Sequence, residues 1–292
     1  MLLNKKSLVL KGTMLIATSM LFVACGSDTP KEELTEEVAV DSTVVVEEET
    51  ETTSYSLPSP LQIASIFKKS GLKYKDGVTS SQKDVAKYTT NLNKALNLGV
   101  YSADLSYSVL NKQNQEAMNY MKLCRQLADN LGMGSVFDQG NLSARFEKNL
   151  GNEDSLAYII AELQMVTDMY LDENNQQQIT SIVFAGAWVE SLYIGSKVFE
   201  KSKSKDLNSK LAEQMTILES IVNALKAEEK KDANITGLIA DMESVKTIYD
   251  ALESVKKFRE STDENAEVTL SDEEVAQLTK KIEEVRTKFI NG

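Results

Sequence analysis

Histidine is absent from the 292-residue chain, and cysteine occurs only twice, as Cys25 and Cys124. Without histidine the chain cannot form a Ser-His-Asp triad, a Cys-His dyad or a histidine-ligated metal site. Two cysteines, one of them in a leader-like segment, cannot form a disulfide framework. We therefore predict no catalytic residues, no metal site and no cofactor, and the sequence by itself assigns no specific activity.

Basic residues are also scarce. The chain carries 32 Lys and Arg against 44 Asp and Glu, for a net charge of −12, and only four residues are arginine. Binding to a phosphate backbone requires a basic surface, so this composition argues against nucleic acid as a partner. All three prolines occur before residue 61. Long uninterrupted helices are therefore possible over the rest of the chain.

The first 24 residues have the composition of a cleaved export signal. Three lysines among the first 11 residues precede a short apolar segment, residues 13–23, and Ala24 precedes Cys25. The run Leu21-Phe22-Val23-Ala24-Cys25 resembles the lipobox of bacterial lipoproteins, although Phe22 departs from the usual leucine-type residue. The resemblance implies cleavage by a signal peptidase of type II, acylation of Cys25 (palmitate included) and a membrane anchor. An uncleaved helix and a plain secretory leader are the alternatives, but the apolar segment is shorter than the roughly 20 residues of a membrane span.

Residues 26–56 carry ten acidic residues and one basic residue, Lys31, with no aromatic residue before Tyr55. Such a segment repels itself and buries too little apolar surface to fold. We predict that residues 25–56, including the lipidated Cys25, form a disordered acidic tether, which as a coil would span roughly 30 Å. A β-strand through residues 44–46 is the alternative.

Residues 57–292 are predicted to form one all-α domain. Leu57-Pro58-Ser59-Pro60 predicts a helix over 61–70 that ends before Gly71, and Thr79 with Gln82 has the spacing of a capping box that opens a helix to about residue 98. Ser271 and Glu274 have the same spacing before a last helix over 272–290. Helical periodicity predicts the intervening helices over 100–110, 113–131, 142–150, 153–171, 176–200, 206–228 and 234–259.

Three blocks of sequence recur in the same order within residues 99–170 and 186–249. Gly99-Val100-Tyr101 aligns with Gly186-Ala187-Trp188, the apolar residues of 121–131 align with those of 215–225, and 160–170 aligns with 239–249. Amphipathic helices share apolar spacing by chance, but ordered agreement over three blocks favours a duplication. We therefore expect a helical bundle of two duplicated three-helix units with flanking N- and C-terminal helices.

The segment 179–199 is apolar on nearly every side, which predicts a helix buried in the bundle, and Glu190 is its only acid. A buried carboxylate must be paired, hydrogen-bonded or protonated, and such groups concentrate at functional sites. An ordinary pair with a lysine or a tyrosine hydroxyl is the alternative. The nearby aromatic residues fit either a small-ligand pocket or a core with hydrogen-bonded hydroxyls. The candidate ligand-binding residues are Tyr101, Asp104, Tyr107, Trp188, Glu190 and Tyr193.

As a whole the chain resembles uncharacterised all-helical lipoproteins of Bacteroidetes-type bacteria, a resemblance carried mainly by the leader. The helix with Gly186, Trp188 and Glu190 is also faintly similar to imelysin-like periplasmic proteins, but Trp188 stands where their motif has a histidine, so no site is carried over. We expect a lipid-anchored protein of the cell envelope, periplasmic or surface-facing at the outer membrane, that acts without catalysis as an interaction or scaffold protein for an envelope partner. The alternatives are a module that binds a small apolar or aromatic ligand between the two helical units, and an enzyme that uses carboxylates alone.

Overall fold

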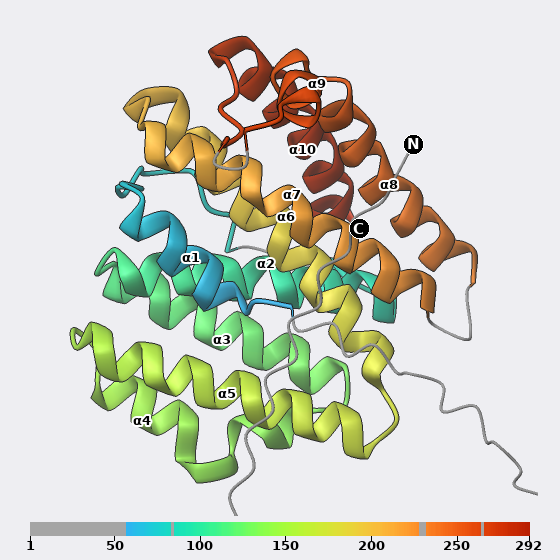
Figure 1. Ribbon diagram of the computed structural model, residues 1–292. Coiled ribbons are helices and arrows are strands. Elements are labelled where there is room, and N and C mark those ends of the chain that lie inside the picture. The colour runs from blue at the N-terminus through green and yellow to red at the C-terminus, as the bar shows by residue number, and fades with distance from the viewer. Residues whose placement is uncertain (1–56, 83–84, 228–231, 264–265) are drawn as a thin grey trace, which may run out of the picture. The chain divides into compact units, whose positions relative to one another are not determined.

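The structure, a computed structural model, describes residues 57–82, 85–227, 232–263 and 266–292. The predicted signal peptide (1–24) and the predicted tether (25–56, with Cys25) lie outside the described residues. The described residues form ten α-helices and three short 3-10 helices, with no strand among them (Figure 1). The prediction of an all-α helical bundle is confirmed. The α-helices are α1 (Pro60–Lys69), α2 (Asn91–Leu110), α3 (Asn114–Asn130), α4 (Leu142–Lys148), α5 (Glu153–Glu173), α6 (Gln177–Ser202), α7 (Lys205–Ala227), α8 (Ala233–Asp250), α9 (Glu253–Glu260) and α10 (Asp272–Asn291).

Helices α2 and α6 pack against each other along the middle of the bundle and form its most extensive helix pair. Gly99 in α2 and Gly186 in α6 lie where they meet. A Cβ atom on Gly99 would lie 1.9 Å from the Val183 carbonyl oxygen, and one on Gly186 would lie 2.0 Å from the Leu96 carbonyl oxygen. Only glycine leaves room for backbones this close. The contact is reciprocal, because Leu96 and Val183 each lie three residues before the glycine of their own helix.

Helix α6 is the core helix that its apolar sequence predicts. Among the described residues it is the one helix long and apolar enough to cross a membrane, but 83% of its most apolar window is buried inside the bundle. Trp188, Val189 and Glu190 are all fully buried. Helix α6 is therefore apolar on every side because other helices surround it.

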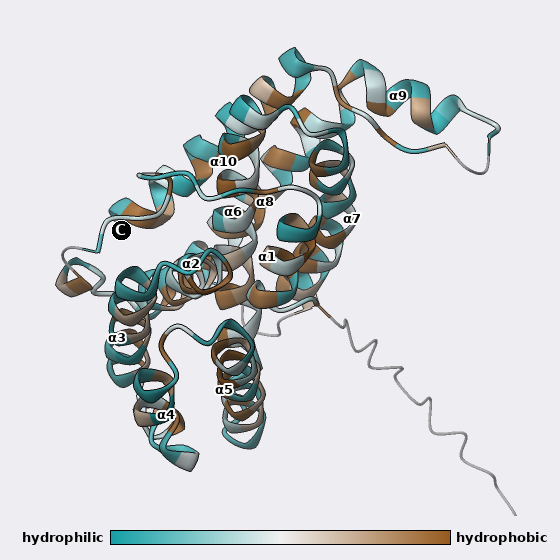
Figure 2. Cartoon of the chain, turned by 90° about the vertical axis from the view of Figure 1, so that its left-hand side faces the viewer, coloured by the Kyte–Doolittle hydropathy of each residue, from teal (hydrophilic) through white to brown (hydrophobic). Residues whose placement is uncertain are grey.

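Two groups of buried apolar side chains lie on either side of the α2–α6 pair. One group joins α2, α3, α4 and α5, with Tyr101 and Phe146 among its members. The other joins α1, α6, α7, α8 and α10, with Trp188 and Ile282 among its members. Hydrophilic residues lie on the outer sides of helices such as α3 and α10 (Figure 2). The two halves of the domain thus bury separate cores against a shared central helix pair.

Helix ends follow the sequence signals at both ends of the domain. Ser59 and Gln62 form a capping box at the start of α1, and Pro60 is its first residue. Gly71, just after α1, has a φ of 95°, the left-handed conformation that ends many helices. Ser271 and Glu274 form the predicted capping box at the start of α10.

The predicted capping box at Thr79 and Gln82 is wrong. The described part of residues 78–90 contains only a short 3-10 helix, η1 (Val85–Lys87), and α2 begins at Asn91, with Thr90 as its N-cap. The cause is tertiary. Around Ser80 the backbone N–H donates to a side chain of α2 and the carbonyl accepts from a side chain of α3, in place of helical hydrogen bonds.

Two other helix limits differ from prediction. The expected break near residue 99 is absent, because Gly99 is an ordinary helical residue inside a continuous α2. The single helix expected over 234–259 is divided into α8 and α9. Leu252 between them has an extended backbone (φ −66°, ψ 137°) and is buried, so the division places an apolar side chain in the core.

The third helices of the two aligned sequence copies, α5 and α8, do not pack in the same way. Helix α5 contacts α2, α4 and α6, whereas α8 contacts α7, α9 and α10. The Tyr170 hydroxyl donates to the Gly132 carbonyl just after α3, whereas the aligned Tyr249 hydroxyl donates to the Ala212 carbonyl within α7. The sequence agreement between 160–170 and 239–249 does not correspond to equivalent contacts.

Candidate functional site

Glu190 and Arg286 form a buried ion pair between α6 and α10. Arg286 Nε donates to Glu190 Oε2 at 2.5 Å, and Arg286 Nη2 donates to Glu190 Oε1 at 2.9 Å. Glu190 is fully buried, and Arg286 is only 8% exposed. Two parallel hydrogen bonds between a guanidinium and a carboxylate give the strongest form of such a pair. The partner of Glu190 is therefore an arginine, not the lysine or tyrosine considered from the sequence.

Ser80 joins the segment before α2 to this ion pair. Arg286 Nη2 donates to Ser80 Oγ at 2.7 Å, and Ser80 Oγ donates to Glu190 Oε1 at 3.2 Å. The Ser80 backbone N–H donates to Asp104 Oδ2 at 3.1 Å, and its carbonyl accepts from the Tyr120 hydroxyl at 2.6 Å. Helices α2, α3, α6 and α10 are thus connected through one serine.

Asp104 adds a second carboxyl to this cluster and is itself fully buried. Burial and the neighbouring Glu190 carboxylate raise the pKa of Asp104 well above its ordinary range, while Arg286 acts in the opposite direction. No donor among the described residues reaches Asp104 Oδ1. One guanidinium cannot neutralise two carboxylates, and a proton on Asp104 gives its free oxygen a donor toward Glu190. The raised pKa of Asp104 favours its neutral form beside the ion pair of Glu190 and Arg286.

Sequence reasoning missed Arg286, although a signal for it exists. The buried residues of α10 follow a helical stripe through Val275, Leu278, Ile282 and Phe289, and Arg286 occupies a position within that stripe. A cation on the apolar face of an amphipathic helix requires a buried anion as its partner. Glu190 is the acid whose sequence surroundings called for such a partner.

Three of the predicted tyrosines lie around this cluster. The Tyr101 hydroxyl donates to the Ser81 carbonyl at 3.2 Å, and the Tyr107 hydroxyl accepts from the Lys75 backbone N–H at 2.7 Å. The Tyr193 ring lies 4.1 Å from the guanidinium carbon of Arg286, within range of a cation–π interaction. Burial raises the pKa of Tyr107 to about 12. These tyrosines hold the segment before α2, or the arginine, in place.

Trp188 lies apart from the other five candidates. It is fully buried, and its indole N–H donates to the Gln214 carbonyl of α7 at 3.2 Å. It therefore belongs to the packing between α6 and α7. The structure brings Asp104, Glu190 and Tyr193 together, with Tyr101 and Tyr107 nearby. The carboxylate of Glu190 is already paired with protein groups. Ligand binding by the six candidate residues therefore stays a prediction from the sequence.

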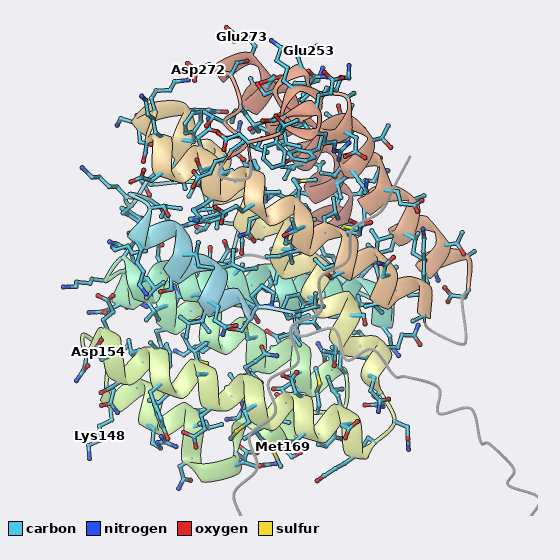
Figure 3. The ribbon with its side chains drawn as sticks, viewed as in Figure 1. Lys148, Asp154, Met169, Glu253, Asp272 and Glu273 are labelled. Atoms are coloured by element: carbon cyan, nitrogen blue, oxygen red, sulfur yellow. The ribbon has the colours of Figure 1, made fainter. Side chains whose placement is uncertain are left out.

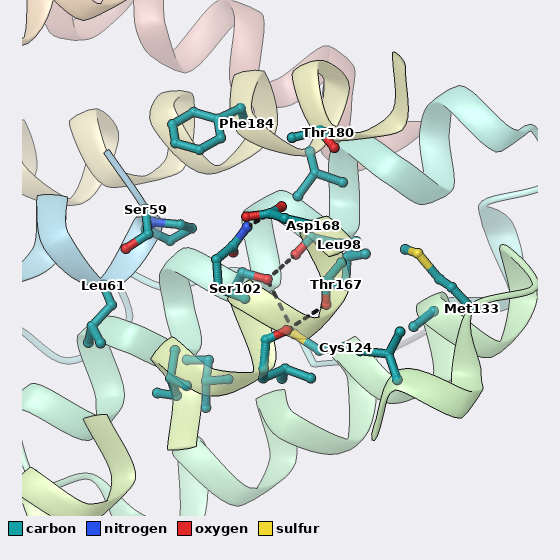
Figure 4. Close-up of a pocket in the computed structure, with 18 of the residues that line it drawn as sticks. Ser59, Leu61, Leu98, Ser102, Cys124, Met133, Thr167, Asp168, Thr180 and Phe184 are labelled. Carbon is teal, nitrogen blue, oxygen red and sulfur yellow. Dashed lines mark hydrogen bonds between the residues drawn. The ribbon is translucent and has the colours of Figure 1, made fainter. Parts of the chain in front are cut away.

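A larger open space lies elsewhere, between α1, α2, α3, α5 and α6. The space is only partly enclosed, and its empty volume of about 820 Å³ includes the part open to solvent. Its walls are mainly aliphatic. The aromatic residues among the described ones that line it are Phe137 and Phe184, and Phe184 is labelled in Figure 4. We call this space the α5 cavity. The apolar residues that line it are Pro60, Leu61, Leu98, Leu105, Ala128, Met133, Val136, Phe137, Ile160, Leu163, Leu171, Val183 and Phe184.

Three hydroxyls on the walls of the α5 cavity already use their own hydrogens. The hydroxyls of Ser102, Ser106 and Thr167 each donate to the carbonyl four residues earlier, at 2.7, 2.8 and 2.7 Å. A hydroxyl that donates in this way still has lone pairs to offer. These three groups therefore present hydrogen-bond acceptors to whatever occupies the cavity.

Among the described residues that line the α5 cavity, Asp168 is the only one with a carboxyl group, and none is a lysine or arginine. It is exposed to solvent, and Gln164 Nε2 donates to its Oδ1 at 2.9 Å. No described lysine or arginine forms an ion pair with it. Burial raises the pKa of Asp168, and the hydrogen bond from Gln164 opposes that rise. The cavity thus carries an acid and no cation.

Cys124 also lines the cavity and is free and buried, as its position on the apolar side of α3 predicts. Its Sγ lies 3.8 Å from Ser102 Oγ. Burial raises the pKa of Cys124 to about 12, so the thiolate is scarce at neutral pH. We expect such a thiol to be neither a reactive nucleophile nor a metal ligand. Its slow chemical modification can still be used to monitor the inner wall of the cavity.

A smaller cavity of about 270 Å³ lies between α1, α2 and α6, and Tyr107 and Ser191 are among its lining residues. Neither this space nor the α5 cavity is lined by Glu190 or Asp104. No group of three or more Cys, Asp or Glu residues within the described ranges could hold a metal ion. No protein family, curated protein or solved structure gave a match to this chain.

Proposed function

We propose that the chain is a lipid-anchored envelope protein whose helical domain binds an apolar ligand in the α5 cavity, without catalysing a reaction. The observation that carries the proposal is the cavity itself, with its aliphatic walls and few polar groups. Sites for small molecules are mostly apolar and concave, with a small number of placed polar groups. The site differs from the one expected from the sequence, because it lies within the first half of the domain and lacks Tyr101, Trp188 and Glu190.

The binding part of this proposal is tested with a neutral fluorescent apolar probe, N-phenyl-1-naphthylamine. The test uses the full chain with Cys25→Ser, so that no acyl anchor requires detergent. We expect saturable binding that Ser102→Leu reduces at least about tenfold, because the larger side chain fills the cavity. Ser102 is suitable because its hydroxyl bonds only to its own helix and to Cys124.

Ala161→Leu is the matched control, since Ala161 is exposed on α5 and does not line the cavity. It adds comparable apolar volume to the same region and should leave binding unchanged. Absence of saturable probe binding to the parent chain, or equal loss in both variants, overturns the binding proposal.

The anchor part of the proposal rests on the leader, with Ala24 before Cys25. Cys25→Ser should leave an unprocessed precursor or release the protein from the membrane fraction, whereas the parent chain should fractionate with the outer membrane. A processed Cys25→Ser protein that still fractionates with membranes would contradict acylation at this position.

A second proposed function, docking of an envelope protein, is supported by an apolar stripe on α5. Tyr158, Met165 and Met169 are 67%, 55% and 55% exposed and follow one face of this helix. Met169 of α5 and Glu273 of α10 are labelled in Figure 3. Flexible Met side chains suit adaptable protein surfaces. A photo-crosslinking residue at position 165 should yield one discrete product in cells, and the same residue at position 273, which is exposed on another helix, should not.

We also propose that α2 and α6 derive from a duplicated segment. The reciprocal contact of Gly99 and Gly186 supports this, because equivalent residues meet equivalent residues, as in a two-fold arrangement. The different packing of α5 and α8 restricts the proposal to the central helices and those that follow them, α3 and α7. Superposition of α2–α3 on α6–α7 with Gly99 over Gly186 tests it.

A further inference from the structure

We propose that the ligand of the α5 cavity is a single-chain amphiphile whose head is an amine or a hydroxyl, and that Asp168 distinguishes it from a fatty acid. This inference rests on the proposed function, since it names the chemical class of ligand for the same cavity. It is carried by the charge and hydrogen-bonding character of the lining residues.

The tail is assigned by the walls and the volume. Thirteen apolar side chains surround the cavity, and aliphatic ones outnumber the two phenylalanines. Contact with a saturated chain needs no ring stacking, so aliphatic walls suit such a chain better than they suit an aromatic ligand. The volume of about 820 Å³ includes space open to solvent, so the enclosed part is smaller still and does not hold a lipid with two or more long chains.

The class of head group follows from the absence of cationic side chains on the described lining. No lysine or arginine among the described residues lines the cavity, so a carboxylate or phosphate head would find no cationic partner there. The remaining donors on its walls belong to the neutral side chains of Ser59, Gln164 and Thr180. The three inner hydroxyls spend their hydrogens on helix carbonyls. An anionic head beside Asp168 would also meet a like charge, which is unfavourable when partly desolvated.

The same lining favours a head group that donates hydrogen bonds. Asp168 keeps one oxygen beyond the single bond it accepts from Gln164, and it has no ion-pair partner among the described residues. An ammonium or hydroxyl group can donate to that oxygen while its chain extends past Ser102 and Thr167 toward Cys124. Figure 4 shows these side chains around the same space.

The test is displacement of N-phenyl-1-naphthylamine from the full chain with Cys25→Ser by dodecylamine, dodecanol and dodecanoate, each below its micelle concentration. We expect dodecylamine and dodecanol to displace the probe at least about tenfold more tightly than dodecanoate, which corresponds to about 1.4 kcal/mol. Asp168→Lys should reverse the order, so that dodecanoate becomes the tightest ligand.

Asp154→Lys is the matched control, because Asp154 is an exposed acid on α5 that does not line the cavity. It changes the net charge equally and should leave the order of the three ligands unchanged. Probe binding with no head preference, a preference for dodecanoate, or an equal effect of both substitutions overturns this inference while leaving the proposed function intact. Failure of the probe to bind the parent chain overturns the proposed function first.

Discussion

Gly99 and Gly186 each face the backbone of the other's helix, and no side chain fits at either position. The Cβ of an alanine would lie 1.9 Å from the Val183 carbonyl oxygen at the first position and 2.0 Å from the Leu96 carbonyl oxygen at the second. These clashes involve backbone atoms of the central helices. They cannot be relieved by rotation of a side chain.

We predict that Gly99→Ala and Gly186→Ala each lower the free energy of unfolding by about 1–3 kcal/mol, the range for overpacking a core. Gly237 provides the control, since it is helical in α8 and nothing lies within 4 Å of an added Cβ. Gly237→Ala should raise stability by about 0.4–1 kcal/mol. Urea unfolding of the three variants measures these changes, and equal effects at all three positions would contradict the close contact of α2 and α6.

Removal of one partner from the Glu190–Arg286 pair should be strongly destabilising. Glu190→Gln leaves the buried guanidinium of Arg286 without its bidentate partner and with only the Asp104 carboxyl nearby, and we expect a loss of about 3–5 kcal/mol. The double substitution Glu190→Leu with Arg286→Met should recover most of this loss, because it removes both members of the pair. A urea-unfolding double-mutant cycle of Glu190→Leu, Arg286→Met and their combination measures the coupling. A loss below about 1 kcal/mol for Glu190→Gln would show that the pair is not desolvated.

Asp104 predicts a specific dependence of stability on pH. Its pKa in the folded protein lies well above 3.8, so the folded state binds this proton more tightly than the unfolded state does. The resulting stabilisation is complete below the ordinary aspartate pKa and is lost as pH rises through the raised pKa, by up to about 1.4 kcal/mol per pH unit. Asn mimics the protonated acid, so Asp104→Asn should remove this loss.

The measurement is the difference in unfolding free energy between the parent and Asp104→Asn chains from pH 4 to 8, which isolates this group from Glu190, Arg286 and Tyr120. The parent should become less stable relative to the variant as pH rises. Asp154→Asn, at an exposed position on α5, should show no such trend. A parent that gains stability relative to Asp104→Asn with rising pH would contradict the raised pKa of Asp104.

The all-α architecture could be predicted because its signals are local. Helical periodicity, the absence of proline after residue 60 and the capping box of Ser271 and Glu274 depend only on neighbours in sequence. Thr79 and Gln82 show the limit of such signals. Their capping-box spacing is overridden because Ser80 bonds to Asp104, Glu190 and Arg286, residues that lie far from it in sequence.

The candidate site was predictable only in part for the same reason. The burial of Glu190 could be inferred from its apolar neighbours. Arg286 was missed, although its position on the apolar stripe of α10 indicates that it is buried. The α5 cavity could not be inferred, because it arises from five helices that leave space where they meet. Small residues such as Ser102 and Ala128 on its walls have no unusual pattern in the sequence.

Modification of Cys124 tests the central claim, occupation of the α5 cavity, most directly. Cys124 lines the cavity and is the only thiol of the full chain with Cys25→Ser. Because burial and the raised pKa make this thiol slow to react, its modification by N-ethylmaleimide at pH 8.5 is followed over hours by peptide mass spectrometry, with and without saturating dodecanol. Ser102→Leu is the control that should show no ligand effect. We predict that dodecanol slows the reaction at least about tenfold in the parent chain. An unchanged rate would contradict binding in this cavity.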